Sequence, residues 1–356
     1  MADESHPAHL SPSELGTKDY WETFYARTLT HLSTKHNPST TTTKPPPKDD
    51  ENSDADSDDD DIDDDSDPGT SWFSEHNAPD KVLQFLTDEE FPLAPVNTIP
   101  ASSSSPSSGE DKEGGGGSGQ PSILDLGTGN GSMLALLRKR GGFRGEMVGV
   151  DYSIRSVELA RELQRLRIHS AYLSDSDDSD SDAEGEDEGK DKDTNIRFEE
   201  WDILHHGENN TENEKGTLDW FPYDKGGFDI VLDKGTFDAV SLSDEVVVEG
   251  DGDDTAASAS GRKIQRRVCE RYPGIVRGLV RKGGFVVVTS CNWTEEELVH
   301  WFTSSTGTTG SGGEGQEDRL VVWGRVEYPR FRFGGREGQG VCTVCFQRVE
   351  GKKEEA

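Results

Sequence analysis

Residues 122–132 read SILDLGTGNGS, and this stretch decides the fold. The apolar run 123–126 is typical of a short buried strand. Three glycines follow at alternate positions, Gly127, Gly129 and Gly131, and they allow a tight turn into a helix and a close approach of the backbone to a ligand. In α/β sheets ligands bind beyond the carboxyl ends of the strands. The stretch therefore predicts a ligand-binding loop after the first strand of such a sheet.

Short apolar segments alternate with amphipathic segments along the rest of the chain. The strands are expected at 123–126, 147–150, 196–199, 228–232, 285–289, 320–328 and 341–348. The helices are expected at 132–140, 153–169, 261–282 and 294–302, the last with a capping box from Thr294 to Glu297. Pro273 should break or kink the helix at 261–282. This alternation predicts an α/β, Rossmann-like, doubly wound and mostly parallel sheet in a single domain, 1–356.

The chain of 356 residues has a formal net charge of −34, and much of that charge lies in two runs. Residues 49–67 hold 13 acids and no lysine or arginine, and residues 174–193 hold 11 acids against two lysines. Five segments too polar to bury a core are expected to be disordered insertions in the one domain. They lie at about 33–70, 95–121, 172–194, 249–261 and 303–317. The acidic balance argues against direct nucleic-acid binding and favours basic partners.

The cysteines and the chain start bear on the compartment. The start MADESHPAHL has no signal-peptide pattern, and no run approaches the roughly 20 apolar residues of a membrane helix. We therefore expect reduced thiols and a cytoplasmic protein, with the nucleus as a second compartment. Cys342 and Cys345 form a C-x-x-C pair, but no second ligand pair lies at a usual zinc spacing. We expect no metal, and expect both thiols to fill space along a strand.

Four acidic residues indicate which ligand the loop binds. The third glycine comes one residue too early for a dinucleotide fingerprint, and Asp125, two residues before Gly127, would repel a pyrophosphate. The same acid suits a sulfonium or amino cation, so the loop favours S-adenosylmethionine over NAD. Asp151 ends the second strand, where a carboxylate can bond ribose hydroxyls. Asp202 follows the third strand, where it can accept from an adenine amino group, and Asp233 ends the fourth strand at the ligand crevice.

Three further stretches carry a family resemblance: LGTKDYWETFY (15–25), LDKGTFDA (232–239) and TSCNWTEEEL (289–298). With the glycine loop, they resemble the eukaryotic seven-strand protein-lysine methyltransferases that modify translation elongation factor 1-alpha. The resemblance implies a seven-strand sheet with an antiparallel last strand, S-adenosylmethionine as methyl donor and a lysine of that factor as acceptor. It matches cofactor-binding positions to Gly127, Gly129 and Asp151, and also to Asp202 and Asp233.

The resemblance also suggests where the acceptor enters. Asn292 and Trp293 follow the fifth strand near that entry, and Tyr20 and Trp21 belong to an N-terminal segment, 13–32, that folds over the site. Our hypothesis is that Trp293 and one of the two N-terminal aromatics form the lysine channel, while Asp233 or another carboxylate orients the amine. Tyr20 and Trp21 are equally compatible with positions in the hydrophobic core.

Two positions depart from the family pattern, and several functions stay open. Many relatives place an aromatic residue where Thr236 stands, and many loops read GCGNG, with a cysteine in place of Thr128. The alternatives are a methyltransferase for a small molecule, for a nucleobase amine or for another protein, and a non-catalytic acidic escort of basic partners. We expect a monomer.

Overall fold

The centre of the molecule is a seven-stranded sheet with the strand order β3-β2-β1-β4-β7-β11-β8. Its strands are β1 (Ile123–Leu126), β2 (Met147–Asp151), β3 (Arg197–Glu200), β4 (Phe228–Lys234), β7 (Val280–Ser290), β8 (Arg319–Val326) and β11 (Cys342–Val349). The pairs from β3 to β7 are parallel, whereas β11 runs antiparallel to both of its neighbours. The predicted fold, with its antiparallel last strand, is confirmed. The computed structural model describes residues 6–36, 73, 76–98, 119–167, 195–205, 217–249, 264–304, 318–333 and 336–350.

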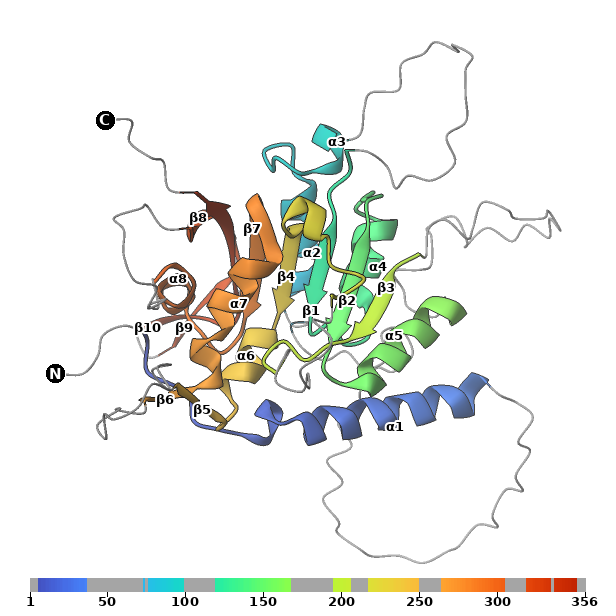
Figure 1. Ribbon diagram of the computed structural model, residues 1–356, viewed down its shortest axis with the longest axis horizontal. Helices are drawn as coiled ribbons and strands as arrows, with labels where there is room; N and C mark the ends of the chain where they lie inside the picture. Colours follow the sequence, from blue (N-terminus) through green and yellow to red (C-terminus); the bar gives the residue numbers. More distant parts are fainter. Residues whose placement is uncertain are drawn as a thin grey trace, which may run out of the picture.

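Helices cover both faces of this sheet and one of its edges (Figure 1). The α-helices are α1 (Lys18–His36), α2 (Ala78–Thr87), α3 (Pro95–Thr98), α4 (Ser132–Lys139), α5 (Ile154–Leu166), α6 (Thr236–Ser241), α7 (Tyr272–Leu279) and α8 (Glu295–Thr303). Short 3₁₀ turns are η1 (Glu14–Gly16), η4 (Tyr223–Lys225) and η5 (Val268–Glu270). Within the described ranges no helix is both long and apolar enough to cross a bilayer.

The core has two layers because successive strand residues point to opposite faces. On β1, Leu124 and Leu126 pack with residues of α7 and α8, whereas Ile123 packs with residues of α2 and α4. The C-x-x-C pair follows the same rule, since Cys342 lies in the first layer and Cys345 in the second. Both are buried free thiols, as the strand-filler interpretation expects.

Most predicted elements lie within a few residues of the observed ones, and the predicted capping box is confirmed. Thr294 and Glu297 form the predicted capping box of α8, and the Ser153 side chain accepts from the Ser156 backbone N–H at the start of α5. These signals act within one helical turn, so local sequence is enough to specify them.

The predicted helix 261–282 is wrong. Its first half is strand β6 (Ile264–Arg267) followed by η5, and only α7 is helical. Pro273 stands in the first turn of α7, where its missing N–H costs nothing, so it starts a helix and does not kink one. Strand β7 then begins at Val280, five residues before the expected start.

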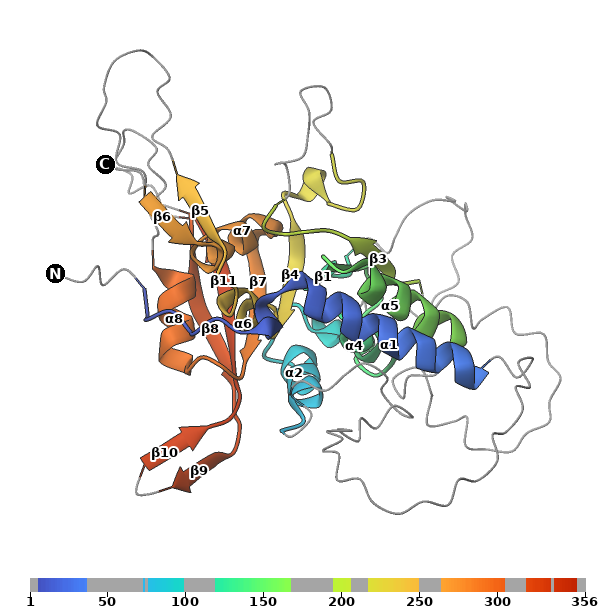
Figure 2. The ribbon, with the colours of Figure 1, turned by 90° about the horizontal axis from the view of Figure 1, so that it is seen from below.

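Two small hairpins were not predicted. Strand β6 pairs with β5 (Val246–Glu249), and β9 (Arg330–Phe333) pairs with β10 (Arg336–Gln339) to form a ribbon that extends from the sheet (Figure 2). The ends of four expected insertions also lie in regular elements, because α1 reaches residue 36, α3 occupies 95–98, β5 includes residue 249 and α8 includes residue 303. Most of the five segments, including both acidic runs, lies outside the described residues.

Candidate active site

A cavity of about 310 Å³ lies at the carboxyl ends of β1, β2 and β4, as the sheet rule predicts. Helix α1 crosses this edge of the sheet and supplies one wall (Figures 1 and 2). Five of the predicted site residues line the cavity: Trp21, Gly127, Gly129, Asp151 and Asp202. The structure thus brings the N-terminal segment, the glycine loop and the acids after β2 and β3 to one place.

The glycine loop is required by both its backbone and its surroundings. Gly127 and Gly129 have φ of +57° and +59°, in the left-handed region that favours glycine. A Cβ at Gly127 would lie 2.2 Å from Oγ1 of Thr236, and one at Gly129 would lie 3.1 Å from the Tyr25 hydroxyl. The missing side chains therefore keep open the space between the loop, α1 and α6.

Gly131 has a different task from the other two glycines. It precedes α4 with φ of +76°, and a Cβ there would lie 2.6 Å from the ring of Phe198. It is not among the cavity-lining residues. Its role in the structure is to close the turn and to allow close packing, so it supports the loop from behind.

Asp125 also lies behind the loop. Its side chain is 3% exposed and accepts a 2.8 Å hydrogen bond from Oγ1 of Thr128. Burial raises the pKa of Asp125 to about 6, although the Thr128 hydroxyl acts in the opposite direction. Asp125 does not line the cavity, whereas Thr128 does. Thr128 stands where the GCGNG pattern has a cysteine. Its hydroxyl donates a hydrogen bond that fixes the loop to the end of β1.

Asp151 joins the loop to the start of α5. Its carboxylate accepts from the Gly129 N–H at 3.1 Å, the Ser153 N–H at 2.9 Å and the Ser156 hydroxyl at 2.8 Å. Burial raises the pKa of Asp151, and these three hydrogen bonds act against that rise. The carboxylate is held at the cavity wall by fixed donors, where it can accept further hydrogen bonds from ligand hydroxyls.

Asp202 forms a chain of polar groups that the sequence did not reveal. It accepts from the Leu204 N–H at 3.0 Å and lies 3.1 Å from Nδ1 of His205, whose Nε2 lies 2.7 Å from Oε1 of Glu245. Burial disfavours the charged imidazole, but the two carboxylates outweigh it and raise the pKa of His205. All three ionisable groups line the cavity. His205 and Glu245 lie 40 residues apart, so no local motif could have joined them.

The aromatic wall from α1 is formed by Trp21, Phe24 and Tyr25. The indole Nε1 of Trp21 donates to the Leu15 carbonyl at 2.8 Å, which fixes the ring on η1. Tyr20 does not line the cavity; its ring packs edge-on against Trp21 with centroids 5.1 Å apart. The N-terminal segment thus covers the cavity, with Trp21, Phe24 and Tyr25 as its inward aromatics.

Comparison with known proteins agrees with this site. A family model described as a methyltransferase domain matches residues 118–174, which contain the glycine loop and Asp151. The protein named protein-lysine N-methyltransferase EFM4 of Saccharomyces cerevisiae is 30% identical over 95% of this chain and 96% of its own length. This chain belongs to the EFM4 family. A Schizosaccharomyces pombe protein with the same name is 26% identical, over 95% of each chain. The human protein named EEF1A lysine methyltransferase 2 is 24% identical over 95% of this chain and 88% of its own. The chain is therefore an enzyme of the methyltransferase class.

In this EFM4-family enzyme Asp233 lies in the core and not on the cavity wall. It is 1% exposed and accepts from the Thr236 N–H at 2.9 Å, the Phe237 N–H at 3.2 Å and the Tyr272 hydroxyl at 2.8 Å. Burial raises the pKa of Asp233 to about 7, and the Tyr272 hydrogen bond is the largest opposing effect. The carboxylate holds the start of α6, so the structure gives it a capping position and not the amine-orienting position that we expected.

Trp293 and Asn292 also lie outside the cavity of this EFM4-family enzyme. The Trp293 indole is 5% exposed, donates to the Ser241 hydroxyl at 3.2 Å and stacks on Phe237 at 6.0 Å. Asn292 is exposed at the end of β7. The structure thus places Trp293 in the core and not in the lysine channel, because the aromatic side chains of α6 and α8 enclose it.

Proposed function

We propose that this chain transfers the methyl group of S-adenosylmethionine to a lysine side chain of translation elongation factor 1-alpha. The observation that carries the proposal is the single cavity in which the glycine loop, Asp151 and the aromatic wall of α1 meet. The protein substrate is supported by the names of the relatives, one of which is EEF1A lysine methyltransferase 2. We also propose the cytoplasm as the compartment of the enzyme, because the proposed acceptor acts in translation.

The cavity residues fit S-adenosylmethionine. A Cβ at Gly129 would fill the space in front of the Tyr25 hydroxyl, so the loop is shaped for close contact with a ligand. Asp151 would hold the ribose hydroxyls, and Asp202 would accept from the adenine amino group. When bound, this cofactor supplies a reactive methyl group on a positively charged sulfur.

The chain itself must align a neutral amine with that methyl group. A free lysine has a pKa of about 10.4, so its deprotonation near pH 7.4 costs about 4 kcal/mol. A partly apolar channel beside a positive charge lowers this pKa because both conditions disfavour the ammonium form. No nucleophile from the protein is needed, so the work of the site is alignment and desolvation.

The cavity walls suit this acceptor. The Trp21 ring and the side chains of Ala239 and Val240 form apolar lining, and Glu245 contributes a carboxylate beside it. A carboxylate at the wall attracts a cationic lysine from solvent, and the apolar lining then favours loss of its proton. In this proposal Trp21 is the N-terminal aromatic of the channel, and Trp293, which does not line the cavity, has no part in it.

The first test is methyl transfer from radiolabelled S-adenosylmethionine to purified elongation factor 1-alpha. The wild-type chain should label a lysine, located by mass spectrometry, and Asp151→Asn should bind the cofactor about tenfold to a hundredfold more weakly, since it removes a charged acceptor. Asp224→Asn, an exposed acid of η4 outside the cavity, is the matched control and should keep both properties.

Two results would overturn parts of the proposal. Binding of the cofactor without labelling of the factor would remove this substrate and leave a methyltransferase with another acceptor, such as a small molecule or a different protein. Absence of cofactor binding in the folded wild-type chain would remove the enzymatic proposal and leave the non-catalytic escort.

A further inference from the structure

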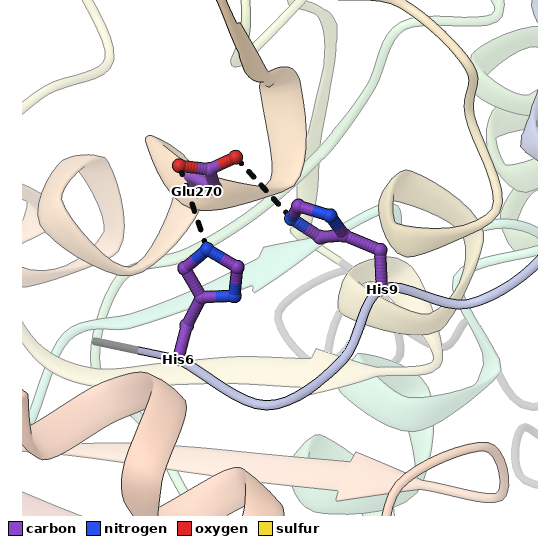
Figure 3. A group of neighbouring side chains, drawn as sticks. All are labelled: His6, His9 and Glu270. Carbon is purple, nitrogen blue, oxygen red and sulfur yellow. Dashed lines mark ion pairs between the residues drawn. The ribbon is translucent and has the colours of Figure 1, made fainter. Parts of the chain in front are cut away.

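A second cluster of ligand-type side chains lies outside the cavity. His6 and His9, three residues apart in the chain that precedes η1, face Glu270 at the end of η5 (Figure 3). His6 Nε2 lies 3.9 Å from Oε2 of Glu270, and His9 Nε2 lies 3.2 Å from Oε1. One atom from each of the three residues lies within 4.8 Å of the other two. The cluster joins parts of the chain that are more than 250 residues apart.

The His6 ring is held with one nitrogen directed at the carboxylate. Its Nδ1 lies 2.7 Å from the carbonyl oxygen of Pro7, and because a carbonyl only accepts, Nδ1 carries the hydrogen. Nε2 is then the ring nitrogen that faces Glu270. A second ring contact fixes this orientation, since His6 stacks on Trp301 with centroids 4.9 Å apart and an interplanar angle of 11°.

Nε2 can share a cation with the Glu270 carboxylate, and that cation is either the proton of an imidazolium ion pair or a metal ion. A histidine whose other ring nitrogen donates to a backbone carbonyl is the usual arrangement of a metal ligand. The two carboxylate oxygens of Glu270 have different partners. Oε1 accepts a hydrogen bond from the Arg267 N–H at 3.0 Å, and Oε2 is the oxygen that faces His6.

We propose that His6, His9 and Glu270 bind one divalent transition-metal ion of the zinc type. Two imidazoles and one carboxylate form a ligand set that zinc uses, with a water molecule in the fourth position. Zinc–ligand distances of about 2.0–2.1 Å place tetrahedral ligand atoms about 3.3 Å apart. The three ligand atoms lie within 4.8 Å of one another, and their separations would shorten towards that tetrahedral value when the ion binds.

The metal would fasten the N-terminal segment beside the cavity. Arg267, at the start of η5, donates through its guanidinium to the carbonyls of Leu10, Ser241 and Ser243. Ser243 lines the cavity, whereas none of the three proposed ligands does. The site is thus separate from the cofactor position, and its metal would stabilise the segment that leads into α1. This proposal does not rest on the proposed methyl transfer.

The test is direct metal binding by the full-length chain without a histidine tag, after removal of metals with EDTA. Co²⁺ is titrated in and followed by its visible absorption, and Zn²⁺ is measured by equilibrium dialysis. The wild type should bind one ion per chain with the spectrum of four-coordinate Co²⁺, and Zn²⁺ should displace it. His6→Ala and Glu270→Gln should each weaken binding about tenfold or more.

The controls separate this site from other histidines and from unfolding. His31→Ala combined with His76→Ala removes two histidines from other parts of the structure and should leave affinity unchanged. Glu270→Gln keeps an oxygen for the Arg267 N–H, and circular dichroism should show that it remains folded. A wild type that binds no ion overturns the proposal, as does an equal loss of affinity in the histidine control.

Discussion

The phenol hydroxyl of Tyr272 donates a 2.8 Å hydrogen bond to Oδ2 of Asp233 in the core. This pair joins the start of α7 to the end of β4, next to the cavity floor formed by Gly235 and Thr236. Burial raises the pKa of Asp233 to about 7 from its ordinary value of 3.8. A carboxyl group that is neutral at mildly acidic pH can also donate a hydrogen bond, so its charge state affects the stability of the cavity floor.

The first prediction concerns pH and stability. The folded-state pKa of Asp233 lies above the unfolded value, so the stabilising effect of the protonated form is complete below about pH 3.8 and is lost as pH rises through about 7. A shift of this size corresponds to about 4 kcal/mol. Asp233→Asn removes the titration, and its free energy of unfolding should fall less than that of the wild type between pH 5 and pH 8. Urea titrations at several pH values measure this, and parallel pH profiles would contradict it.

The second prediction concerns the loop glycine that faces α6. Gly127→Ala places a Cβ 2.2 Å from Oγ1 of Thr236 at a φ of +57°. The left-handed backbone alone costs about 1–2 kcal/mol for alanine. We expect lower stability and weaker binding of S-adenosylmethionine, measured by thermal unfolding and calorimetry. Adding Thr236→Ala should relieve the contact and restore part of the loss. A double variant as weak as the single one would show that the steric contact is not the cause.

The sequence predicted those parts of the fold and site whose signals are local. The glycine loop, Asp151 at the end of β2 and the capping box at Thr294 each depend on residues a few positions apart. The β5–β6 hairpin and the burial of Trp293 depend on partners that are distant in sequence. Val246 pairs with Arg267, and the Trp293 indole donates a hydrogen bond to Ser241. An aromatic residue after a strand suits either a channel or a core, and only the packing around it decides which.

The third prediction tests the hydroxyl that distinguishes this loop from the GCGNG pattern. Thr128→Val keeps the side-chain shape but removes the 2.8 Å donor to Asp125, whose carboxylate is 3% exposed. Loss of a hydrogen bond to a buried acceptor costs about 1–3 kcal/mol. Thr128→Val should lower the free energy of unfolding by that amount and raise the pKa of Asp125 further.

Thr128→Ser is the matched control for this change, because it retains the hydroxyl. It should stay close to the wild type in urea unfolding, and NMR titration of the Asp125 carboxyl carbon should show a higher pKa in the valine variant alone. Equal destabilisation by serine and valine would mean that the methyl group of Thr128 matters and its hydroxyl does not.

The last prediction separates Trp293 and Trp21, two of the aromatic residues that the sequence offered for the lysine channel. Trp21 lines the cavity, whereas Trp293 is 5% exposed and packs on Phe237. Trp293→Phe should therefore lower the free energy of unfolding by about 1–3 kcal/mol, because it leaves a void in the core and removes the hydrogen bond to Ser241. It should leave kcat/KM of the folded enzyme unchanged. Trp21→Phe should instead reduce kcat/KM for the protein acceptor about tenfold, equivalent to about 1.4 kcal/mol, because a smaller ring stands at the cavity wall. Its lost hydrogen bond to Leu15 should also lower the melting temperature, so the fall in kcat/KM is the result that distinguishes it from Trp293→Phe. Steady-state kinetics and thermal unfolding of both variants measure these effects. A fall in kcat/KM confined to Trp293→Phe would show that Trp293, and not Trp21, lines the lysine channel.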